Sequence, residues 1–270
     1  MAYTQTDLKN LSAGELALRH LSVDFQTDRG IVHAVRDVSF HVIKGRITAL
    51  VGESGSGKSV TSLTVMGLLA PNGRVSSGQI LLDGQDVLRL SRKERQKLNG
   101  KRFGMIFQDP SASLDPLFSV ENQMTEGIRS HRRIDRREAR EECLQHLRAV
   151  NLVNPEEILK KRPFELSGGM CQRVMIAIAM AQKPDFLIAD EPTTALDVTV
   201  QKQILRQVYS LAREQDVGVL FITHDLGVVA EIADEVAIMK DGEIVEYGDV
   251  MDIFDRPVHA YTRQLLDAVL

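Results

Sequence analysis

The eight residues at 52–59 constrain this chain more than any other stretch. They read GESGSGKS, and this spacing of Gly, Lys and Ser is typical of a phosphate-binding loop. An apolar run at 47–51 precedes them and predicts a buried strand, and a helical pattern from 60 to about 69 follows. The glycines let the backbone turn tightly, while the new helix presents unpaired N–H groups and a positive dipole end to an anion. The sequence therefore predicts a nucleotide site between a strand and a helix.

Two side chains of this loop have defined chemical roles. Lys58 supplies a point charge for the β- and γ-phosphates, and the Ser59 hydroxyl is placed to bind Mg²⁺. The competing interpretation is a strand–helix turn rich in Gly and Ser, which would not require Lys-Ser at its end. The predicted nucleotide-binding residues are Gly52, Ser54, Gly55, Ser56, Gly57, Lys58, Ser59 and Val60.

The composition is that of an ordinary globular chain, and it argues against several partners. The 270 residues are 43% hydrophobic and 26% charged, enough for a sizeable core in one or two domains. A net charge of -4 and the absence of Trp argue against nucleic acid as a partner. The spacing of Cys143 and Cys171 is not metal-binding, which fits a reducing compartment. The polar N-terminus and the lack of an apolar run of about 20 residues predict that any membrane role runs through a partner at the surface.

The periodicity along the chain predicts an α/β fold. Apolar runs of strand length alternate with helical patterns, which implies right-handed crossovers and a parallel sheet. Between residues 110 and 180 the β-branched strands disappear, so we expect a helical subdomain inserted into the α/β core. The expected strands are 15–25, 31–42, 47–51, 79–84, 103–107, 186–189 and 217–223, with a hairpin at 236–245, and the expected helices are 60–69, 91–98, 120–129, 137–150, 173–181, 200–213 and 258–270.

Two carboxylates close one of the apolar strands. Asp190 and Glu191 follow the run at 186–189, so they lie at the carboxyl edge of the sheet, where α/β folds bind ligands. Because side chains alternate in direction along a strand, the two can take different tasks. Asp190 suits the Mg²⁺ shell, and Glu191 suits polarisation of the attacking water as general base. The alternative is an ordinary acidic loop, which the phosphate-binding loop upstream disfavours.

A second Gly-rich stretch precedes another helix. Ser167, Gly168 and Gly169 stand before the helical pattern at 173–181 and form a second anion-binding N-terminus. Two phosphate sites on one nucleotide domain can serve one nucleotide only if they come from different chains. A simple loop or C-cap would explain the glycines, but not their position beside serine at a helix start.

Six arginines lie in the polar stretch at residues 129–140. A solvated helix face, mixed with Asp135 and Glu138, is the favoured interpretation. A surface that faces anionic lipid is the alternative. The six are Arg129, Arg132, Arg133, Arg136, Arg137 and Arg140.

The set of motifs resembles one family over about residues 16–266. The phosphate-binding loop, Gln108, the LSGGM stretch, Asp190-Glu191, Asp197 and His224 occur in the order of the ABC-transporter nucleotide-binding subunits. The resemblance implies one domain over 1–270, with a P-loop NTPase (RecA-like) core, an antiparallel β subdomain and an inserted helical subdomain. It also implies head-to-tail dimers that sandwich two ATP molecules. The implied divisions are about 16–109 and 181–257 for the core and β subdomain, about 110–180 for the helical signature subdomain and 258–270 for a C-terminal helix.

The resemblance assigns a role to each matching residue. Phe25 aligns with the aromatic residue that stacks on adenine, although a core aromatic is the alternative. Gln108 resembles the glutamine that contacts Mg²⁺ or water and senses the membrane partner. His224 resembles the switch histidine that contacts the γ-phosphate and the attacking water. With Lys58 and Glu191, Gln108 and His224 complete the implied catalytic set, and Ser59, Gln108 and Asp190 form the implied Mg²⁺ set.

Other matching residues are implied to serve the opposite subunit. Ser167 and Gly169, with Gly168 between them, resemble the signature residues that hold the γ-phosphate of the other chain's ATP. Met170 stands where the family has Gln, which should not abolish binding because the contacts come from Ser167 and backbone N–H groups. Asp197 resembles the aspartate that lies across the dimer interface.

A narrower resemblance is to the bacterial oligopeptide, dipeptide and nickel importer ATPases. It is carried by residues 53–61, 105–110, 168–170, 188–199 and 259–266, with Ala260 where that group usually has Pro. Many of its members continue into a Cys-bearing extension, so a shorter nickel-like branch and a truncated chain both stay open.

The partners follow from the same resemblance. It implies ATP hydrolysis that powers import, two transmembrane permease subunits and a second ATPase chain. In the cell a heterodimer is expected, and in isolation a homodimer. A solute-binding protein outside the cytoplasm would act indirectly, and the expected location is the cytoplasmic face of the inner membrane, peripherally bound.

The sequence disfavours two rival functions. A soluble ABC ATPase of DNA repair or translation usually carries two nucleotide domains or a long coiled coil, and the sequence indicates neither. A non-catalytic regulatory subunit is disfavoured by the intact Lys58, Asp190, Glu191 and His224.

Overall fold

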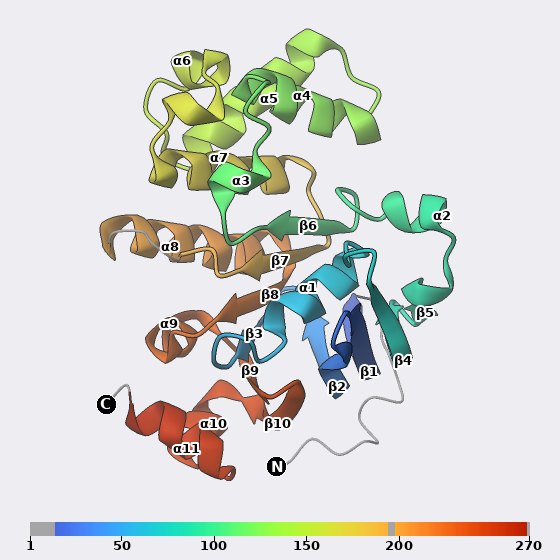
Figure 1. The fold of residues 1–270 in the computed structure, drawn as a ribbon. Coiled ribbons are helices and arrows are strands. Elements are labelled where there is room, and N and C mark those ends of the chain that lie inside the picture. The colour runs from blue at the N-terminus through green and yellow to red at the C-terminus, as the bar shows by residue number, and fades with distance from the viewer. Residues whose placement is uncertain (1–13, 194–197, 269–270) are drawn as a thin grey trace.

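A six-stranded sheet forms the centre of the molecule (Figure 1). The computed structural model describes residues 14–193 and 198–268, and in them the strand order of this sheet is β10-β9-β3-β8-β7-β6. The five strands from β9 to β6 run parallel, and β10 joins the edge antiparallel to β9. Every residue of β3, β7 and β8 is buried, as expected for parallel strands covered on both faces. The strands are β3 (Ile47–Val51), β6 (Phe103–Ile106), β7 (Phe186–Asp190), β8 (Gly218–Thr223), β9 (Glu235–Lys240) and β10 (Glu243–Asp249).

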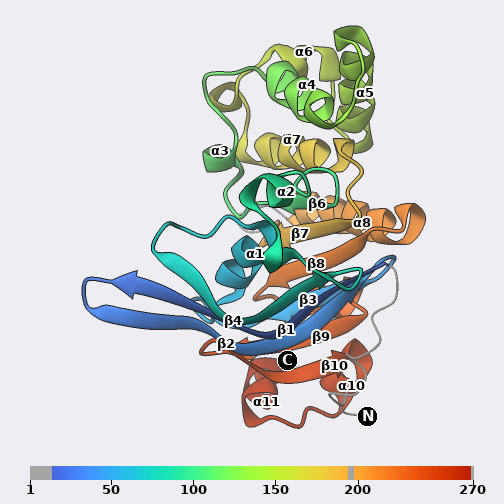
Figure 2. The same cartoon turned by 90° about the vertical axis from the view of Figure 1, so that its right-hand side faces the viewer.

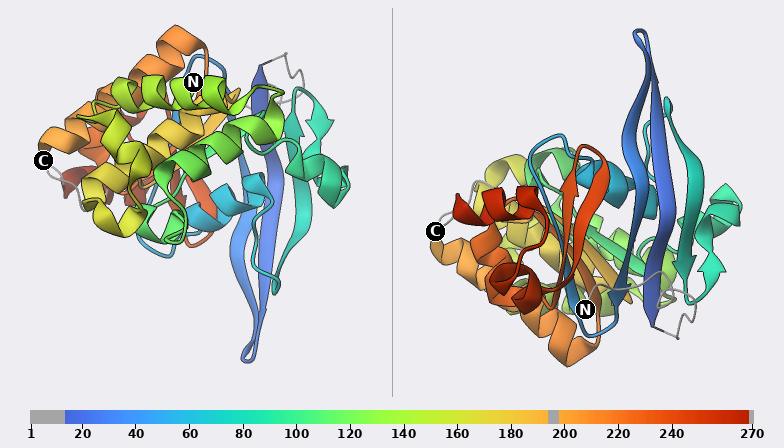
Figure 3. Two further views of the ribbon diagram at one scale, coloured as in Figure 1. Left: turned by 90° about the horizontal axis from the view of Figure 1, so that it is seen from above. Right: turned by 90° about the horizontal axis from the view of Figure 1, so that it is seen from below.

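A second, antiparallel sheet has the order β2-β1-β4-β5 in the described residues. Its first two strands form a long hairpin that reaches beyond the helices, as Figures 2 and 3 show from three sides. Apolar side chains of this sheet, such as Phe40 and Ile80, share one buried cluster with Leu50 and Leu220 of the parallel sheet. The predicted β subdomain is therefore packed on one face of the core. Its strands are β1 (Glu15–Thr27), β2 (Gly30–Ile43), β4 (Gly73–Leu82) and β5 (Gln85–Asp86).

Helix α1 (Lys58–Met66) follows the phosphate-binding loop, but its bounds differ from the prediction of 60–69. It ends at Met66 because Gly67 adopts a left-handed conformation with φ 70°, and its N–H bonds the carbonyls of Leu63 and Thr64. Strand β4 is longer than the predicted 79–84, because its polar first half pairs with β1.

The predicted helical subdomain lies between β6 and β7 and occupies the top of Figure 1. Side-chain oxygens of Ser119 and Asp135 cap α4 and α5. Helix α7 starts at Gly168 rather than at the predicted Arg173, because Ser167 caps it and both glycines fall in its first turn. The helices are α3 (Pro110–Ser113), α4 (Val120–His131), α5 (Arg136–Ala149), α6 (Pro155–Lys160) and α7 (Gly168–Ala181), with a 3₁₀ turn at Pro163–Glu165.

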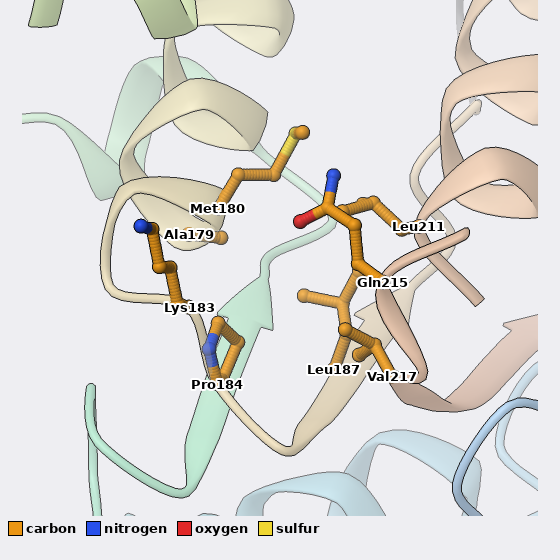
Figure 4. A pocket seen from close by; sticks show the side chains of 8 residues that line it. All are labelled: Ala179, Met180, Lys183, Pro184, Leu187, Leu211, Gln215 and Val217. Carbon is orange, nitrogen blue, oxygen red and sulfur yellow. The ribbon is translucent and has the colours of Figure 1, made fainter. Parts of the chain in front are cut away.

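One apolar cluster joins the helical subdomain to the core. It runs without interruption from Met124 and Leu144 of the subdomain to Leu187 and Phe221 of the parallel sheet. Helix α8 (Val198–Gln215) adds Ile204, Leu205 and Val208 to it, on the face that the sequence predicted. Figure 4 shows where α7 ends against β7 and α8, around a small pocket with Met180, Leu187 and Leu211 on its wall.

The remaining helices are short and lie mainly in the second half of the chain. Helix α11 is shorter than the predicted 258–270 because it begins only after His259, which caps it. Helices α9 and α10 were not predicted, and each begins at a capping aspartate, Asp225 or Asp249. Within the described ranges no helix is long and apolar enough to cross a membrane. The remaining bounds are α2 (Arg92–Gln96), α9 (Leu226–Ile232), α10 (Val250–Asp255) and α11 (Ala260–Asp267), with a 3₁₀ turn at Val87–Arg89.

Candidate nucleotide site

The phosphate-binding loop requires glycine at two of its positions because other backbone lies against them. A Cβ on Gly52 would lie 2.1 Å from the carbonyl oxygen of Met239 in β9. A Cβ on Gly57, whose φ is 105°, would lie 2.5 Å from the carbonyl oxygen of Ala34 in β2. Glu53, Ser54 and Gly55 stay exposed at the crest of the loop. The loop is therefore fitted closely to the protein on its inner side and open on its outer side.

Lys58 folds back into the loop. Its Nζ donates hydrogen bonds to the carbonyl oxygens of Gly52 at 2.7 Å and Glu53 at 2.8 Å, and the residue is 5% exposed. Burial lowers the pKa of Lys58, while the nearby carboxylates of Glu191 and Asp190 act in the opposite direction. The ammonium group therefore lies inside the curve of the loop, where the phosphates of a nucleotide would be held.

Asp190 lies beneath the loop, bonded to two hydroxyl groups of α1. The Oγ atoms of Ser59 and Ser62 donate to its carboxylate at 3.2 Å and 3.0 Å. Burial raises the pKa of Asp190, since the residue is 4% exposed, although the two hydroxyls act the other way. Ser62 was not among the predicted residues, and its position one helical turn after Ser59 was the signal that could have found it.

The predicted Mg²⁺ ligands are of the chemical type that this cation takes. The Ser59 hydroxyl, the Asp190 carboxylate and the Gln108 amide offer oxygen atoms, which a small hard cation prefers. Mg²⁺ also keeps several waters and takes ligands from substrate phosphates, so a few protein oxygens are enough. Among the described residues no cluster of three or more His, Cys, Asp or Glu side chains could hold a metal by itself.

Glu191 brings two other predicted residues together. Gln108 Nε2 donates to Glu191 Oε2 at 3.1 Å, and His224 Nδ1 lies 3.4 Å from Glu191 Oε1. The backbone of Glu191 has φ 45°, an unusual value for a non-glycine residue, and its N–H donates to the carbonyl of Ile222 in β8 at 2.9 Å. The three side chains come from the ends of β6, β7 and β8, which are neighbours in the sheet. The predicted catalytic carboxylate is thus held between an amide and an imidazole.

The predicted signature residues lie at the N-terminal end of α7, in the helical subdomain. The Ser167 Oγ accepts a hydrogen bond from the N–H of Met170 at 3.4 Å, and Ser167 and Gly168 are exposed. In the part of the chain that the structure describes, no hydrogen bond joins Ser167, Gly168 or Gly169 to the loop at 52–59. The absence of such a bond is compatible with the expectation that the stretch serves another chain. Asp197 lies outside the described residues.

Phe25 lies on the antiparallel sheet near the end of β1. The residue is half-buried, and a Cβ added to Gly73 of β4 would lie 2.7 Å from its ring. Its ring therefore covers a position that has no side chain. Stacking on adenine stays a prediction beside the alternative of a core aromatic.

Gln172 is a further residue that the sequence did not identify. It is 2% exposed, and its Nε2 donates to the carbonyl oxygen of Pro192 at 2.6 Å. This bond ties α7 to the segment directly after Glu191. A buried amide side chain in an apolar helix was the available signal, because such groups need a partner.

Comparison with known proteins identifies the family. A profile described as ABC transporter matches residues 35–194. Over 255 residues the chain is 49% identical to the dipeptide transport ATP-binding protein DppD of Bacillus subtilis, covering 94% of this chain and 76% of that protein. The chain belongs to the ABC transporter family. The oligopeptide transport ATP-binding protein OppD of the same organism is 50% identical over 252 residues, covering 93% of this ABC protein and 70% of the relative.

Solved structures agree with the architecture of this ABC protein. A dimeric post-hydrolysis structure of the ATP-binding cassette MJ0796, bound to ADP and Pi, matches with a TM-score of 0.79 at 26% identity. It covers 87% of this chain and 98% of that one. The cbiO1 protein from Clostridium perfringens matches with a TM-score of 0.74 at 29% identity, covering 89% and 90%. The predicted cassette fold and the predicted ATPase activity are therefore confirmed, while the roles of single residues stay predictions.

Proposed function

We propose that this ABC ATPase powers a bacterial importer of peptides or related small solutes. The proposal is supported by relatives whose names specify dipeptide and oligopeptide transport and by the glutathione import protein GsiA of Shigella dysenteriae, 48% identical over 266 residues. The chain spans 43% of the length of GsiA. Nickel stays an untested alternative for the solute. The observation that carries the enzymatic part is the position of Glu191 between Gln108 and His224, beside Lys58 and Asp190.

Each group has a defined task in the proposed reaction. Residues 52–60 hold the phosphates of ATP, with Lys58 on the β- and γ-phosphates, and Phe25 stacks on the adenine. Glu191 accepts a proton from the attacking water while the oxygen–phosphorus bond to ADP breaks and inorganic phosphate forms. Gln108 and His224 orient the carboxylate and the water. Mg²⁺, held by Ser59, Gln108 and Asp190, would neutralise charge on the phosphates.

A second ATPase chain completes the proposed site. Ser167, Gly168 and Gly169 would contact the γ-phosphate bound to the opposite chain, and Asp197 would lie at the same interface. The exposure of Ser167 at the start of α7 supports this arrangement. The solved dimeric cassette of similar fold supports it as well. We propose a heterodimer in the cell and a homodimer in isolation.

The proposed permease contact lies on the helical subdomain. Leu117 and Phe118 are large apolar side chains that are 75% and 49% exposed just before α4. They adjoin an open groove where a helix of each permease subunit would dock, placing this protein at the cytoplasmic face of the membrane. A solute-binding protein would meet the permeases on the other side. The groove is lined by Phe118, Asn122, Thr125, Glu126, Arg129, Ser130 and Arg136.

Replacement of Glu191 tests the enzymatic proposal. We expect Glu191→Gln to bind ATP like the wild type and to hydrolyse it about 10²–10⁴-fold more slowly, since the general base is lost. The matched control is Glu231→Gln on the exposed face of α9, which should hydrolyse ATP normally. Wild-type turnover in Glu191→Gln would overturn the assignment.

Co-purification tests the importer proposal. Tagged protein extracted from membranes should carry two multi-pass membrane proteins with it. Recovery without membrane proteins would favour a soluble ABC ATPase. Replacement of Phe118 by Asp should release the permeases while ATP binding by the isolated chain is retained.

A further inference from the structure

The C-terminal helix α11 contacts the phosphate-binding loop directly. Tyr261, in its first turn, is 4% exposed, and its Oη accepts a hydrogen bond from the backbone N–H of Glu53 at 3.3 Å. The ammonium group of Lys240 lies 4.6 Å from the centre of the tyrosine ring. One tyrosine thus joins the last helix, the end of β9 and the second residue of the loop.

The helix that carries Tyr261 is itself anchored. The Glu246 carboxylate of β10 accepts hydrogen bonds from the N–H groups of Val258 at 2.7 Å and His259 at 3.0 Å. His259 Nδ1 then accepts from the N–H of Tyr261 at 3.2 Å and caps the helix. The phenol therefore has a fixed position with respect to the parallel sheet.

The loop is also held on a second side. Gly242 donates its N–H to the carbonyl of Ser56 at 3.0 Å, and the carbonyl of Ala34 lies against Gly57. The hydrogen bond that Glu53 donates to Tyr261 fixes the opposite end of the loop. It also means that the Glu53 N–H points toward protein, so the phosphate-facing N–H groups begin after Glu53.

We propose that Tyr261 is a positioning residue for the nucleotide site, which fixes the Glu53 amide and holds the loop in its phosphate-binding shape. A loop already held in its binding shape loses less conformational freedom when ATP binds, and its affinity is higher for that reason. The inference rests on the proposal that residues 52–60 hold the phosphates of ATP. It extends that proposal to a residue 208 positions away in sequence.

The test compares two variants that each remove one phenolic hydroxyl with a hydrogen-bond partner. Tyr261→Phe keeps the ring under Lys240 and removes the bond to Glu53. The control Tyr247→Phe removes a hydroxyl that donates to Glu235 at 2.7 Å, away from the loop. Loss of one neutral hydrogen bond predicts that the Kd for ATP rises about threefold to tenfold in Tyr261→Phe, and less than twofold in Tyr247→Phe.

A second readout separates positioning from a general loss of stability. Hydrogen–deuterium exchange without nucleotide should speed up in the peptide that contains Glu53 in Tyr261→Phe, with exchange in β7 and β8 unchanged. Unchanged ATP affinity and unchanged exchange in Tyr261→Phe would overturn the inference, and so would an equal loss of affinity in Tyr247→Phe.

A third variant, Lys58→Ala, distinguishes an error about Tyr261 from an error about the nucleotide site itself. If Lys58→Ala loses ATP binding while Tyr261→Phe binds normally, only the role of Tyr261 is wrong. If Lys58→Ala binds ATP like the wild type, the assignment of the loop itself is wrong.

Discussion

Gln172 Nε2 lies 2.6 Å from the carbonyl oxygen of Pro192 and donates a hydrogen bond to it. Gln172 belongs to α7, the helix that Ser167 caps, and Pro192 is the residue after Glu191. The bond therefore links the stretch proposed to face the opposite chain's nucleotide with the proposed catalytic carboxylate of its own chain.

Loss of this link should slow hydrolysis more than it weakens ATP binding. We expect Gln172→Ala to lower kcat about tenfold, because the segment after Glu191 loses its tie to α7 and the carboxylate is less well placed. The free energy of unfolding should fall by about 1–2 kcal/mol through the unpaired buried carbonyl. Steady-state kinetics and denaturant titration measure the two effects. Gln207→Ala, which removes a less buried amide bonded to the Ala149 carbonyl, is the control and should retain kcat. A normal kcat in Gln172→Ala would contradict the proposed link.

Neutralisation of Asp190 should raise the thermal stability of the protein and abolish its activity. Burial raises the pKa of this carboxyl, which means that the folded protein disfavours its charge. Asp190→Asn should therefore raise Tm without Mg²⁺ by about 2–4 °C, and it should abolish Mg²⁺-dependent hydrolysis. The exposed Asp267→Asn should change neither quantity. A lower Tm for Asp190→Asn, measured by calorimetry, would show that the ionised carboxylate stabilises the empty fold.

We expect the ionisation of Glu235 to make part of the free energy of unfolding depend on pH. Burial alone would raise its pKa, but hydrogen bonds from His41 and Tyr247 outweigh burial and leave the pKa below its ordinary value of 4.5. A lowered pKa in the folded state stabilises the fold at pH values above 4.5, and this stabilisation is lost as the pH falls further. Glu235→Gln should therefore be less stable than the wild type at pH 7, and the difference should shrink in acid.

Denaturant titrations between pH 7 and pH 3 measure this difference for Glu235→Gln. Glu243→Gln, at the first residue of β10, where the carboxylate is 56% exposed, is the matched control and should follow the wild type. A difference that stays constant with pH would mean that the Glu235 carboxylate titrates alike in the folded and unfolded chain.

Both cysteines should be unreactive in the native protein. Cys143 and Cys171 are 0% and 2% exposed, and burial raises the pKa of the Cys143 thiol to about 12. Because the thiolate is the reactive form, a thiol-specific reagent at pH 8 should label neither residue until the protein is unfolded, when both react. Ser113→Cys, at an exposed site on α3, should react at once and serves as the positive control. Rapid labelling of the native wild type would indicate that the helical subdomain opens readily.

The parts of the site that the sequence predicted are those with local signals. The strand and the phosphate-binding loop follow from spacing within some twenty residues, whereas the start of α1 was placed two residues late. The carboxylates Asp190 and Glu191 follow from the end of one apolar run. The end of α1 was misplaced although Gly67, a local signal for a helix C-terminus, was visible.

The contacts that sequence periodicity could not predict are those between distant segments. Strand β3 lies between β8 and β9, which are far from it along the chain, and no local pattern specifies that order. The bond from Glu53 to Tyr261 depends on this order, because it joins the segment after β3 to the helix after β10. Short helices such as α9 were missed because six or seven residues give too little periodicity, and the capping Asp225 alone is a weak signal.

The apolar cluster that runs from Met124 to Phe221 limits how this protein can be recombined. A hybrid ATPase that took only residues 110–180 from a relative, in order to dock on a different permease, would bring a new apolar surface against the old sheet. Poorly packed apolar side chains would then lie under α8 and at Leu187. These positions are separate from the groove beside Phe118, which the exchange was meant to change. A working exchange would therefore have to move the facing residues of β7, β8 and α8 together with the helices.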